Sequence, residues 1–267
     1  MSTQLETILA HTRLELEQRR ASADIALLER NAAAHKPRGF KAALRKAAAS
    51  GPAVIAELKK ASPSKGLIRA DFDPVQLGRT LEQAGAAALS VLTDEKFFQG
   101  SLENLTRASQ AVSIPCLRKD FMVDAFQILE ARAAGADAIL LIVAALADQQ
   151  LASLSAEAER MELDVLCEIH DREELDRAVA LGFSVIGVNS RNLHTMQVDP
   201  RTQTDLAQWL PSNVVRVAES GIRSAADILV MREAGFDAFL IGESLMRQPE
   251  PGPALTALLS SGQPVKI

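Results

Sequence analysis

Eight short apolar runs, spread over most of the chain, constrain its fold more than any other feature of the sequence. The runs are continuous rather than alternating, as in strands that helices cover on both faces. They span residues 54–58, 88–92, 115–118, 138–143, 165–169, 185–189, 214–218 and 238–241. Segments of helical period, such as 148–160 and 172–181, lie between them. A strand followed by a helix, repeated eight times, predicts a parallel sheet.

Turn and cap residues mark the boundaries of these units. Asp73-Pro74 and residues 224–227 (Ser-Ala-Ala-Asp) have the form of helix starts. A glycine stands before four of the runs, where the end of a helix needs a left-handed residue. These glycines are Gly85, Gly135, Gly182 and Gly235. Units of about 20–35 residues favour a closed (β/α)8 TIM barrel over an open sheet, which usually has fewer strands.

The length of 267 residues allows either one large barrel or two ordinary domains of about 150 residues each. No linker of distinct composition divides the chain. Helical stretches at 5–20 and 25–34 precede the first apolar run. We therefore expect residues 1–50 to form an N-terminal helical extension and residues 51–267 to form the barrel, in a single domain overall.

Composition and charge exclude several classes of protein. With 48% hydrophobic, 24% charged and 4% aromatic residues, the chain is typical of a globular protein with an aliphatic core. Its net charge is −5 and it has no dense block of Lys or Arg, so we expect no nucleic-acid partner. The longest apolar run, 138–147, is half the length of a membrane span, which argues against a membrane protein.

The amino terminus and the cysteines point to the cytoplasm. Residues 1–20 mix Glu and Arg with Leu and lack the order of a secretory signal, so we expect a cytoplasmic location. Cys116 and Cys167 each lie in a short apolar stretch. We expect two buried thiols, with neither a disulfide framework nor a cysteine zinc site.

Ionisable and amide side chains stand where the predicted strands end, which in such a barrel is the location of the active site. Glu57 and Lys59 are two residues apart, so strand pleating directs both side chains to the same side. A buried Glu57 needs a cation, and a purely structural pair with Lys119 would satisfy it without catalysis. The candidate catalytic residues are Glu57, Lys59, Lys119, Glu168, Asn189 and Glu219.

Each candidate also has a simpler interpretation. For Lys119, Glu168 and Glu219 it is ion pairing at the rim of the barrel, and for Asn189 it is a tie between loops. His170 is explained more simply as a helix-capping or loop group than as a catalyst. Three further charged groups are most simply solvated or supporting side chains, namely Lys60, Asp120 and Asp171.

Two glycines predict a site for a phosphorylated small molecule. Gly221 follows the seventh run and Gly242 follows the eighth, and both bring backbone N–H groups to the carboxyl ends of the strands. Residues 243–246 are predicted to begin a short helix directed at the same point. This pairing on the last two strands is typical of phosphate sites in barrels of this kind.

Seven motifs at these strand ends, in order along the chain, resemble the indole-3-glycerol-phosphate synthase family. The resemblance extends from about residue 54 to residue 259 and includes the N-terminal extension. The motifs are IAELKKASPSKG (55–66), ALSVLTDEKFFQGS (88–101), LRKDF (117–121), CEIHD (167–171), GVNSRNL (187–193), ESGI (219–222) and LIGESLMR (240–247). Seven motifs in order are far more specific than any one of them.

The resemblance implies an enzyme of tryptophan biosynthesis that needs no cofactor and no metal. Such an enzyme converts 1-(2-carboxyphenylamino)-1-deoxyribulose 5-phosphate to indole-3-glycerol phosphate and releases carbon dioxide and water. By resemblance, Lys119 is the general acid that protonates the substrate carbonyl, and Glu168 is the acid/base partner in the dehydration. Lys59 holds the substrate carboxylate and is a candidate acid in the later step. Glu57, Asn189 and Glu219 position hydroxyl groups and stabilise positive charge.

The resemblance also assigns substrate-binding residues. Ser62, Ser220, Gly221 and Gly242 correspond to phosphate contacts, and Arg191 to a further binding residue. The apolar wall around the anthranilate ring corresponds to Phe121, Leu140 and Leu193. Two positions depart from the family pattern, Ser190 in place of a second Asn and Glu243 in place of Ser. Neither departure argues against the reaction, provided that the charge of Glu243 points away from the phosphate.

Some alternatives stay open at the level of sequence. Lys59 and Lys119 would lower each other's pKa, while neighbouring carboxylates would raise it, so the direction is not determined. Phosphoribosylanthranilate isomerase and the α subunit of tryptophan synthase are barrels with a similar phosphate site, but without this lysine pair. A non-catalytic barrel that binds a phosphorylated ligand is the remaining alternative. The barrel alone is compatible with a monomer, and the sequence leaves the oligomeric state open.

Overall fold

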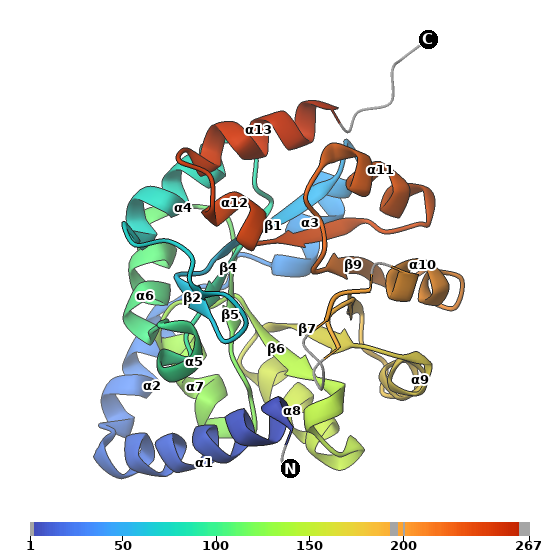
Figure 1. Ribbon diagram of the computed structural model, residues 1–267. Coiled ribbons are helices and arrows are strands. Elements are labelled where there is room, and N and C mark those ends of the chain that lie inside the picture. The colour runs from blue at the N-terminus through green and yellow to red at the C-terminus, as the bar shows by residue number, and fades with distance from the viewer. Residues whose placement is uncertain (1–2, 193–196, 200, 262–267) are drawn as a thin grey trace.

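The computed structural model describes residues 3–192, 197–199 and 201–261. Its centre is a closed barrel of parallel strands, in which each strand pairs with its neighbours along the chain and β10 closes on β1 (Figure 1). The strands are β1 Ala53–Leu58, β4 Ala88–Leu92, β5 Cys116–Lys119, β6 Ala138–Ile142, β7 Asp164–Ile169, β8 Val185–Asn189, β9 Val215–Glu219 and β10 Ala238–Ile241. All eight predicted runs are strands, and the expected (β/α)8 architecture is confirmed.

Helices form an outer ring around the barrel (Figure 1). They are α4 Pro74–Gln83, α6 Leu102–Ala111, α7 Ala125–Ala133, α8 Asp148–Arg160, α9 Arg172–Ala180, α10 Arg201–Ala207, α11 Ala225–Glu233 and α13 Pro251–Ser261. The loops carry the short elements β2 Ala61–Ser62, β3 Gly66–Leu67, α5 Glu95–Phe98, α12 Glu243–Met246 and a 3-10 turn at Val143–Ala145. None of the helices in the described part of the chain is long and apolar enough to span a bilayer.

The predicted cap residues act as expected. Asp73 accepts a hydrogen bond from the backbone N–H of Val75 at the start of α4, next to Pro74. Ser224 and Asp227 form a reciprocal capping box at the start of α11. The four glycines predicted before strands all have a positive φ, between 78° and 98°. These caps fix where each helix ends, and therefore where the following strand begins.

Three helices precede the barrel: α1 Gln4–Ser22, α2 Ile25–Ala34 and α3 Phe40–Ala48. In Figure 1, α1 and α2 lie along the side of the molecule that carries α7. Arg19 of α1 donates a hydrogen bond of 3.0 Å to the Glu130 carboxylate of α7. Phe40 and Leu44 of α3 are fully buried and pack against the interior side chains of the barrel. The helical extension therefore contacts the barrel through both charged and apolar groups.

The apolar core has two parts. One lies between the strands and the outer helices, and the other fills the interior of the barrel below the carboxyl ends of the strands. Cys116 and Cys167 belong to the first part as buried free thiols, as predicted. Burial raises the pKa of Cys116 to about 12, so this thiol stays protonated and unreactive near neutral pH.

Candidate active site

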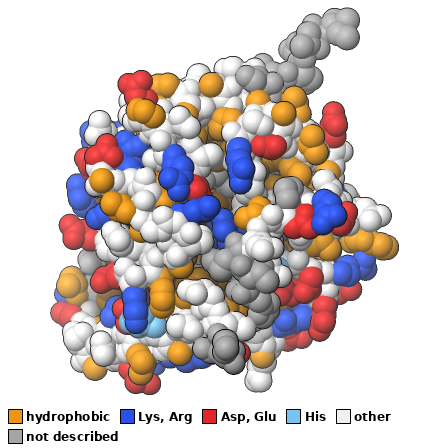
Figure 2. Space-filling model, viewed as in Figure 1, with side chains coloured by type: hydrophobic (Ala, Val, Ile, Leu, Met, Phe, Trp, Pro, Cys, Tyr) orange, Lys and Arg blue, Asp and Glu red, His pale blue; other side chains and the backbone are white. Residues whose placement is uncertain are grey.

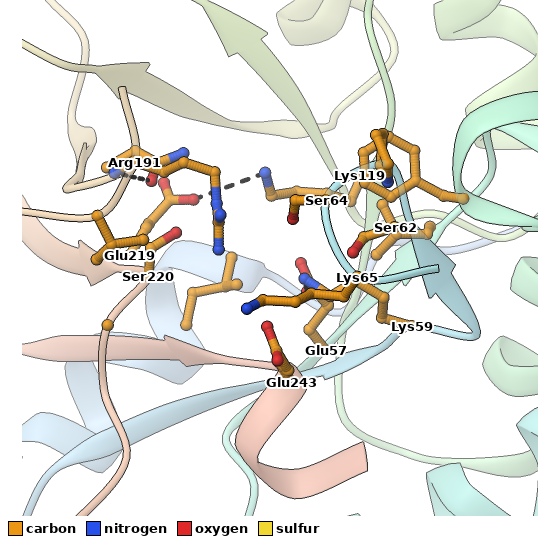
Figure 3. Close-up of a pocket in the computed structure, with 18 of the residues that line it drawn as sticks. Glu57, Lys59, Ser62, Ser64, Lys65, Lys119, Arg191, Glu219, Ser220 and Glu243 are labelled. Atoms are coloured by element: carbon orange, nitrogen blue, oxygen red, sulfur yellow. Dashed lines mark hydrogen bonds and ion pairs between the residues drawn. The ribbon is translucent and has the colours of Figure 1, made fainter. Parts of the chain in front are cut away.

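A cavity of about 790 Å³ opens at the carboxyl ends of the strands (Figure 3). Every predicted site residue that the structure describes lines it. These are Glu57, Lys59, Ser62, Lys119, Phe121, Leu140, Glu168, Asn189, Arg191, Glu219, Ser220, Gly221 and Gly242. Leu193, the remaining predicted residue, lies outside the described residues. The predicted residues thus come from seven of the eight strands or the loops that follow them, and Leu92 adds the eighth strand, β4, to the lining.

Lys119 is the central cation of the cavity floor. Its Nζ lies 3.0 Å from Glu168 Oε2 and 3.7 Å from Glu219 Oε2. Burial alone would favour the neutral amine, but the charges of Glu168, Glu219 and Glu57 outweigh it and raise the pKa of Lys119 above its ordinary value. The direction that the sequence left open is therefore upward, and Lys119 carries a proton at neutral pH.

The two carboxyl groups beside Lys119 have opposite pKa shifts. Burial would raise the pKa of Glu168, but the charge of Lys119 and the contact with His170 hold it well below its ordinary value. Burial and the negative charge of Glu168 together raise the pKa of Glu219 well above its ordinary value. The pKa of one carboxyl group is therefore lowered and that of its neighbour raised, and opposite shifts of this kind suit two similar groups to different roles in proton transfer.

Glu57 pairs with Lys59, two residues further along the same strand end, and not with Lys119. The alternative of a Glu57–Lys119 ion pair is therefore wrong, because Lys119 already lies between Glu168 and Glu219. Gly242 gives Glu57 its space. A Cβ at that glycine would lie 2.2 Å from Glu57 Oε1, so only glycine allows this position of the carboxylate.

The loops after β8 and β9 hold each other in place. The Asn189 side chain accepts a hydrogen bond of 3.0 Å from the backbone N–H of Arg191, so Asn189 also ties its own loop. The Ser190 hydroxyl donates to the Ser220 carbonyl at 3.2 Å, which gives this departure from the family pattern a structural role. Ser220 and Gly221 both have a positive φ, 65° and 80°, at the turn that leaves β9. A non-glycine residue in that conformation is strained, and such strain concentrates at functional sites.

The predicted short helix at 243–246 is present as α12, with Gly242 at its N-cap. The Glu243 carboxylate accepts a hydrogen bond of 2.9 Å from Arg247, one turn further on, which neutralises its charge at the cavity rim. Lys65, Arg223 and Arg247 add positive charge to the lining. Figure 2 shows several Lys and Arg side chains near the centre of this face. This rim suits an anionic group such as a phosphate.

The opposite part of the lining is apolar. Phe121 and Leu140 lie there as predicted, and Phe98 of α5 stacks against Phe121 with ring centroids 6.3 Å apart. Leu5 and Ile8 of α1 close the same side. Sequence reasoning missed these three residues. Phe98 stands in the quoted motif 88–101, which was the one signal that pointed to it.

Asp120 and His170 are supporting groups rather than solvated ones. Asp120 is buried and accepts hydrogen bonds from Arg118 at 2.8 Å and from the Thr93 hydroxyl at 2.6 Å. Despite burial, these partners lower the pKa of Asp120. The His170 ring lies 3.4 Å from the Glu168 carboxylate, directly behind the cavity wall. Of the other two charged groups, Asp171 caps α9 and Lys60 is outside the lining.

A closed (β/α)8 barrel with paired ionisable groups at the carboxyl ends of its strands defines a barrel enzyme. A model of the indole-3-glycerol phosphate synthase family matches residues 5–258, and the chain belongs to this family. The chain is 60% identical to indole-3-glycerol phosphate synthase of Koribacter versatilis over 97% of this chain and 100% of that protein. It is 49% identical to the protein of the same name from Burkholderia vietnamiensis, over 97% and 99% of the two chains.

Comparison with solved structures supports the fold alone. A crystal structure of 3-hexulose-6-phosphate synthase superimposes with a TM-score of 0.63 at 14% sequence identity. The match covers 78% of this chain and 99% of that one. At this identity the likeness concerns the barrel and not its chemistry. The match to the family model and the two relatives, rather than the solved structures, confirm the resemblance seen in the sequence motifs.

Proposed function

We propose that this chain is a carboxy-lyase that closes the indole ring. It converts 1-(2-carboxyphenylamino)-1-deoxyribulose 5-phosphate to indole-3-glycerol phosphate, carbon dioxide and water. The observation that supports this most strongly is the position of Lys119 at the floor of the cavity, with its Nζ 3.0 Å from Glu168 and 3.7 Å from Glu219. A phosphoribosylanthranilate isomerase would not need the second lysine, Lys59, beside it.

Substrate binding follows the polarity of the cavity. The phosphate lies at the rim formed by Ser62, Ser220, Gly221 and Gly242, where backbone N–H groups and nearby cations attract an anion. The anthranilate ring lies against the apolar side, between Phe121 and Leu140. The polar and the apolar side of the cavity hold the two ends of the extended substrate, so that its ketone lies near Lys119. Ring closure is faster in this bound geometry because the reacting atoms are already oriented.

Ring closure needs an acid at the ketone. The ring carbon that bears the carboxylate attacks the ketone carbon, and Lys119 Nζ donates its proton to the ketone oxygen as the new carbon–carbon bond forms. The carboxylate then leaves as carbon dioxide, and the electron pair of the broken bond restores the aromatic ring. Lys59 holds this carboxylate before it leaves, and the positive charge on the substrate nitrogen is stabilised by Glu57 and Glu219.

Dehydration completes the indole. The new hydroxyl group leaves as water after it receives a proton from Lys59, and Glu168 removes the proton from the adjacent ring carbon. Glu168 is suited to this step because its pKa is held low, so it is ionised before the reaction begins. Asn189 positions a hydroxyl group of the substrate chain.

The test is the appearance of indole absorbance and fluorescence when purified protein receives the substrate in the presence of a chelator. We expect product from the wild type and a loss of about 10²–10⁴-fold in kcat for Lys119→Ala, with KM changed far less, because the acid acts mainly on the transition state. Lys60→Ala is the control, since Lys60 lies near Lys59 in the sequence but does not line the cavity.

Two outcomes would contradict the proposal. If the wild type binds the substrate and forms no indole, the chain is a phosphate-binding barrel with other chemistry. If Lys119→Ala turns over at nearly the wild-type rate, Lys119 is not the acid. An activity that the chelator abolishes would contradict the metal-free reaction.

We also propose that the active unit is a cytoplasmic monomer, with residues 1–50 and 51–267 in one cooperative domain. Leu5 and Ile8 of α1 line the cavity together with residues of the barrel, which supports one unit made of the helical extension and the barrel. The substrate is a phosphate ester, which does not cross membranes freely. We expect size-exclusion chromatography with light scattering to give the mass of a monomer, cell fractionation to place the protein in the cytoplasm, and urea unfolding to show a single transition. A dimer, or two separate unfolding transitions, would contradict the proposal.

A further inference from the structure

Behind the cavity wall, three side chains form a row that ends at Glu168. His170 Nε2 lies 3.4 Å from Glu168 Oε1, while Lys119 Nζ lies 3.0 Å from the other oxygen of the same carboxylate. On its far side, His170 Nδ1 lies 3.0 Å from Glu174 Oε2. The backbone N–H of His170 donates to that same oxygen at 2.8 Å. Glu174 thus fixes the ring, and the ring faces Glu168.

The row is charged, and it is buried at Glu168 and mostly buried at His170 and Glu174. The side chains of His170 and Glu174 are 12% and 13% exposed, and that of Glu168 is 2% exposed. Burial would lower the pKa of His170, but Glu168 and Glu174 outweigh it and raise the pKa to about 10. The ring is therefore an imidazolium with an N–H on both nitrogens. Lys119, Glu219 and the thiol of Cys167 also interact electrostatically with Glu168.

The surroundings of Glu174 keep it in place. It lies in the first turn of α9, where its backbone N–H donates to the capping carboxylate of Asp171 at 2.9 Å. Arg177, one turn further along α9, is engaged with Asp148 at 2.7 Å and with the Leu146 carbonyl. His170 is therefore the partner of the Glu174 carboxylate.

We propose that His170, held by Glu174, is a positioning residue for Glu168. It does not line the cavity, so it acts on the reaction only through that carboxylate. The inference rests on the proposed function, in which Lys119 gives away its proton in the first step. Once Lys119 is neutral, His170 is the cation that remains within ion-pair distance of Glu168 in the described structure. It keeps Glu168 ionised and oriented for the later removal of a ring proton.

Two substitutions of His170 separate position from charge. His170→Gln can place an amide N–H donor near the former Nε2, beside Glu168 Oε1, whereas the shorter His170→Asn reaches only toward Glu174. We expect His170→Asn to lower kcat by about 10-fold or more with KM within about 2-fold, and His170→Gln to retain more of the activity. Both lose the positive charge, so the acid limb of the kcat profile moves upward by about one pH unit in each.

Glu174→Gln tests the row from its far end. It leaves the ring in place but removes the charge that holds it, so we expect a smaller shift of the acid limb in the same direction. Asp176→Asn is the matched control, because it removes an exposed carboxylate from an i,i+4 pair with Arg172 on the same helix. The control should show the wild-type profile. Wild-type kcat and acid limb in His170→Asn would overturn the proposal, as would equal effects in Asp176→Asn and Glu174→Gln.

A measurement without turnover separates this inference from the proposed function. The imidazole proton resonance of His170, identified by its loss in His170→Asn, should show no deprotonation below about pH 8 in the wild type and should titrate nearer neutrality in Glu174→Gln. A wild type that forms no indole but shows this titration refutes the function and keeps the ion pairs. A wild-type titration near pH 6.5 refutes the charged row even in an active enzyme.

Discussion

Gly187 is the position where one added methyl group should damage catalysis most directly. It lies in β8, beneath the Glu219 carboxylate, and a Cβ there would be 2.0 Å from Glu219 Oε1 and 3.0 Å from its Cδ. Ordinary contact distances for such atoms exceed 3 Å, so the Gly187→Ala substitution must push the carboxylate aside by about 1 Å or more. The added Cβ would also lie 3.1 Å from Leu166 Cδ1, so the backbone of Gly187 has little room to move away from Glu219.

The magnitude follows from what Glu219 touches. Displacing a group of the active site by about 1 Å is worth roughly 10²-fold in rate, and we expect kcat of Gly187→Ala to fall by about that factor. Overpacking of the barrel interior should also lower the free energy of unfolding by about 1–3 kcal/mol. The assay is the steady-state formation of indole together with urea unfolding of the same preparation.

Gly78→Ala provides the matched control. Its added Cβ would meet Leu89 Cδ1 and Val112 Cγ1, each at 3.2 Å, in the apolar shell and away from the cavity. We expect this variant to keep the wild-type kcat. A second check combines Gly187→Ala with Glu219→Asp, whose shorter side chain relieves the clash, so the double variant should be no slower than Glu219→Asp alone. A folded Gly187→Ala enzyme with kcat within 2-fold of wild type would refute the reasoning.

Three further predictions concern stability. Arg38→Ala should lower the free energy of unfolding in urea by about 3–5 kcal/mol, because it removes the guanidinium at 2.5 Å from the fully buried Asp137 carboxylate and leaves that carboxylate the His35 ring at 3.2 Å. Hydrogen bonds from His35 and Arg38 lower the pKa of Asp137 in the folded state despite its burial. The ionised Asp137 should therefore stabilise the fold above the pKa of about 4 that it has in the unfolded chain, and this stabilisation should be lost as the pH falls through the lower pKa of the folded state. The check is the free energy of unfolding measured from pH 7 to pH 2. Asp94→Asn should stabilise the fold by about 1–2 kcal/mol at pH 7 but not at pH 4. Burial raises the pKa of Asp94 to about 6, so its ionised form is unfavourable in the folded state at pH 7, whereas the neutral Asn can still cap α5. Equal effects at both pH values would contradict this prediction.

The strands and strand ends were predictable because two local rules determine them. Continuous apolar runs mark strands that are buried on both faces, and the parallel order places all their carboxyl ends on one side. Glu57, Lys119 and Glu219 were therefore located before any distance was known. The rules say where a side chain lies along the barrel axis, but not which neighbour across the barrel it contacts.

The partners of these residues depend on distances that the sequence does not contain. Lys59 and Lys119 were equally available to Glu57, and only the packed barrel directs Lys119 to Glu168 and Glu219. Phe98 was missed because α5 has four residues, too few to show a helical period. Leu5 and Ile8 belong to the buried side of α1, and tertiary contacts alone direct that side to the cavity.

Charge balance explains how a lysine with a raised pKa can serve as an acid. Glu57, Glu168 and Glu174 each form an ion pair, with Lys59, Lys119 and His170 respectively. In the proposed first step, the proton of Lys119 passes with its positive charge to the negatively charged substrate, and carbon dioxide then leaves as a neutral molecule. The sum within the buried site therefore stays constant, and the step avoids the electrostatic penalty that would accompany simple deprotonation of Lys119.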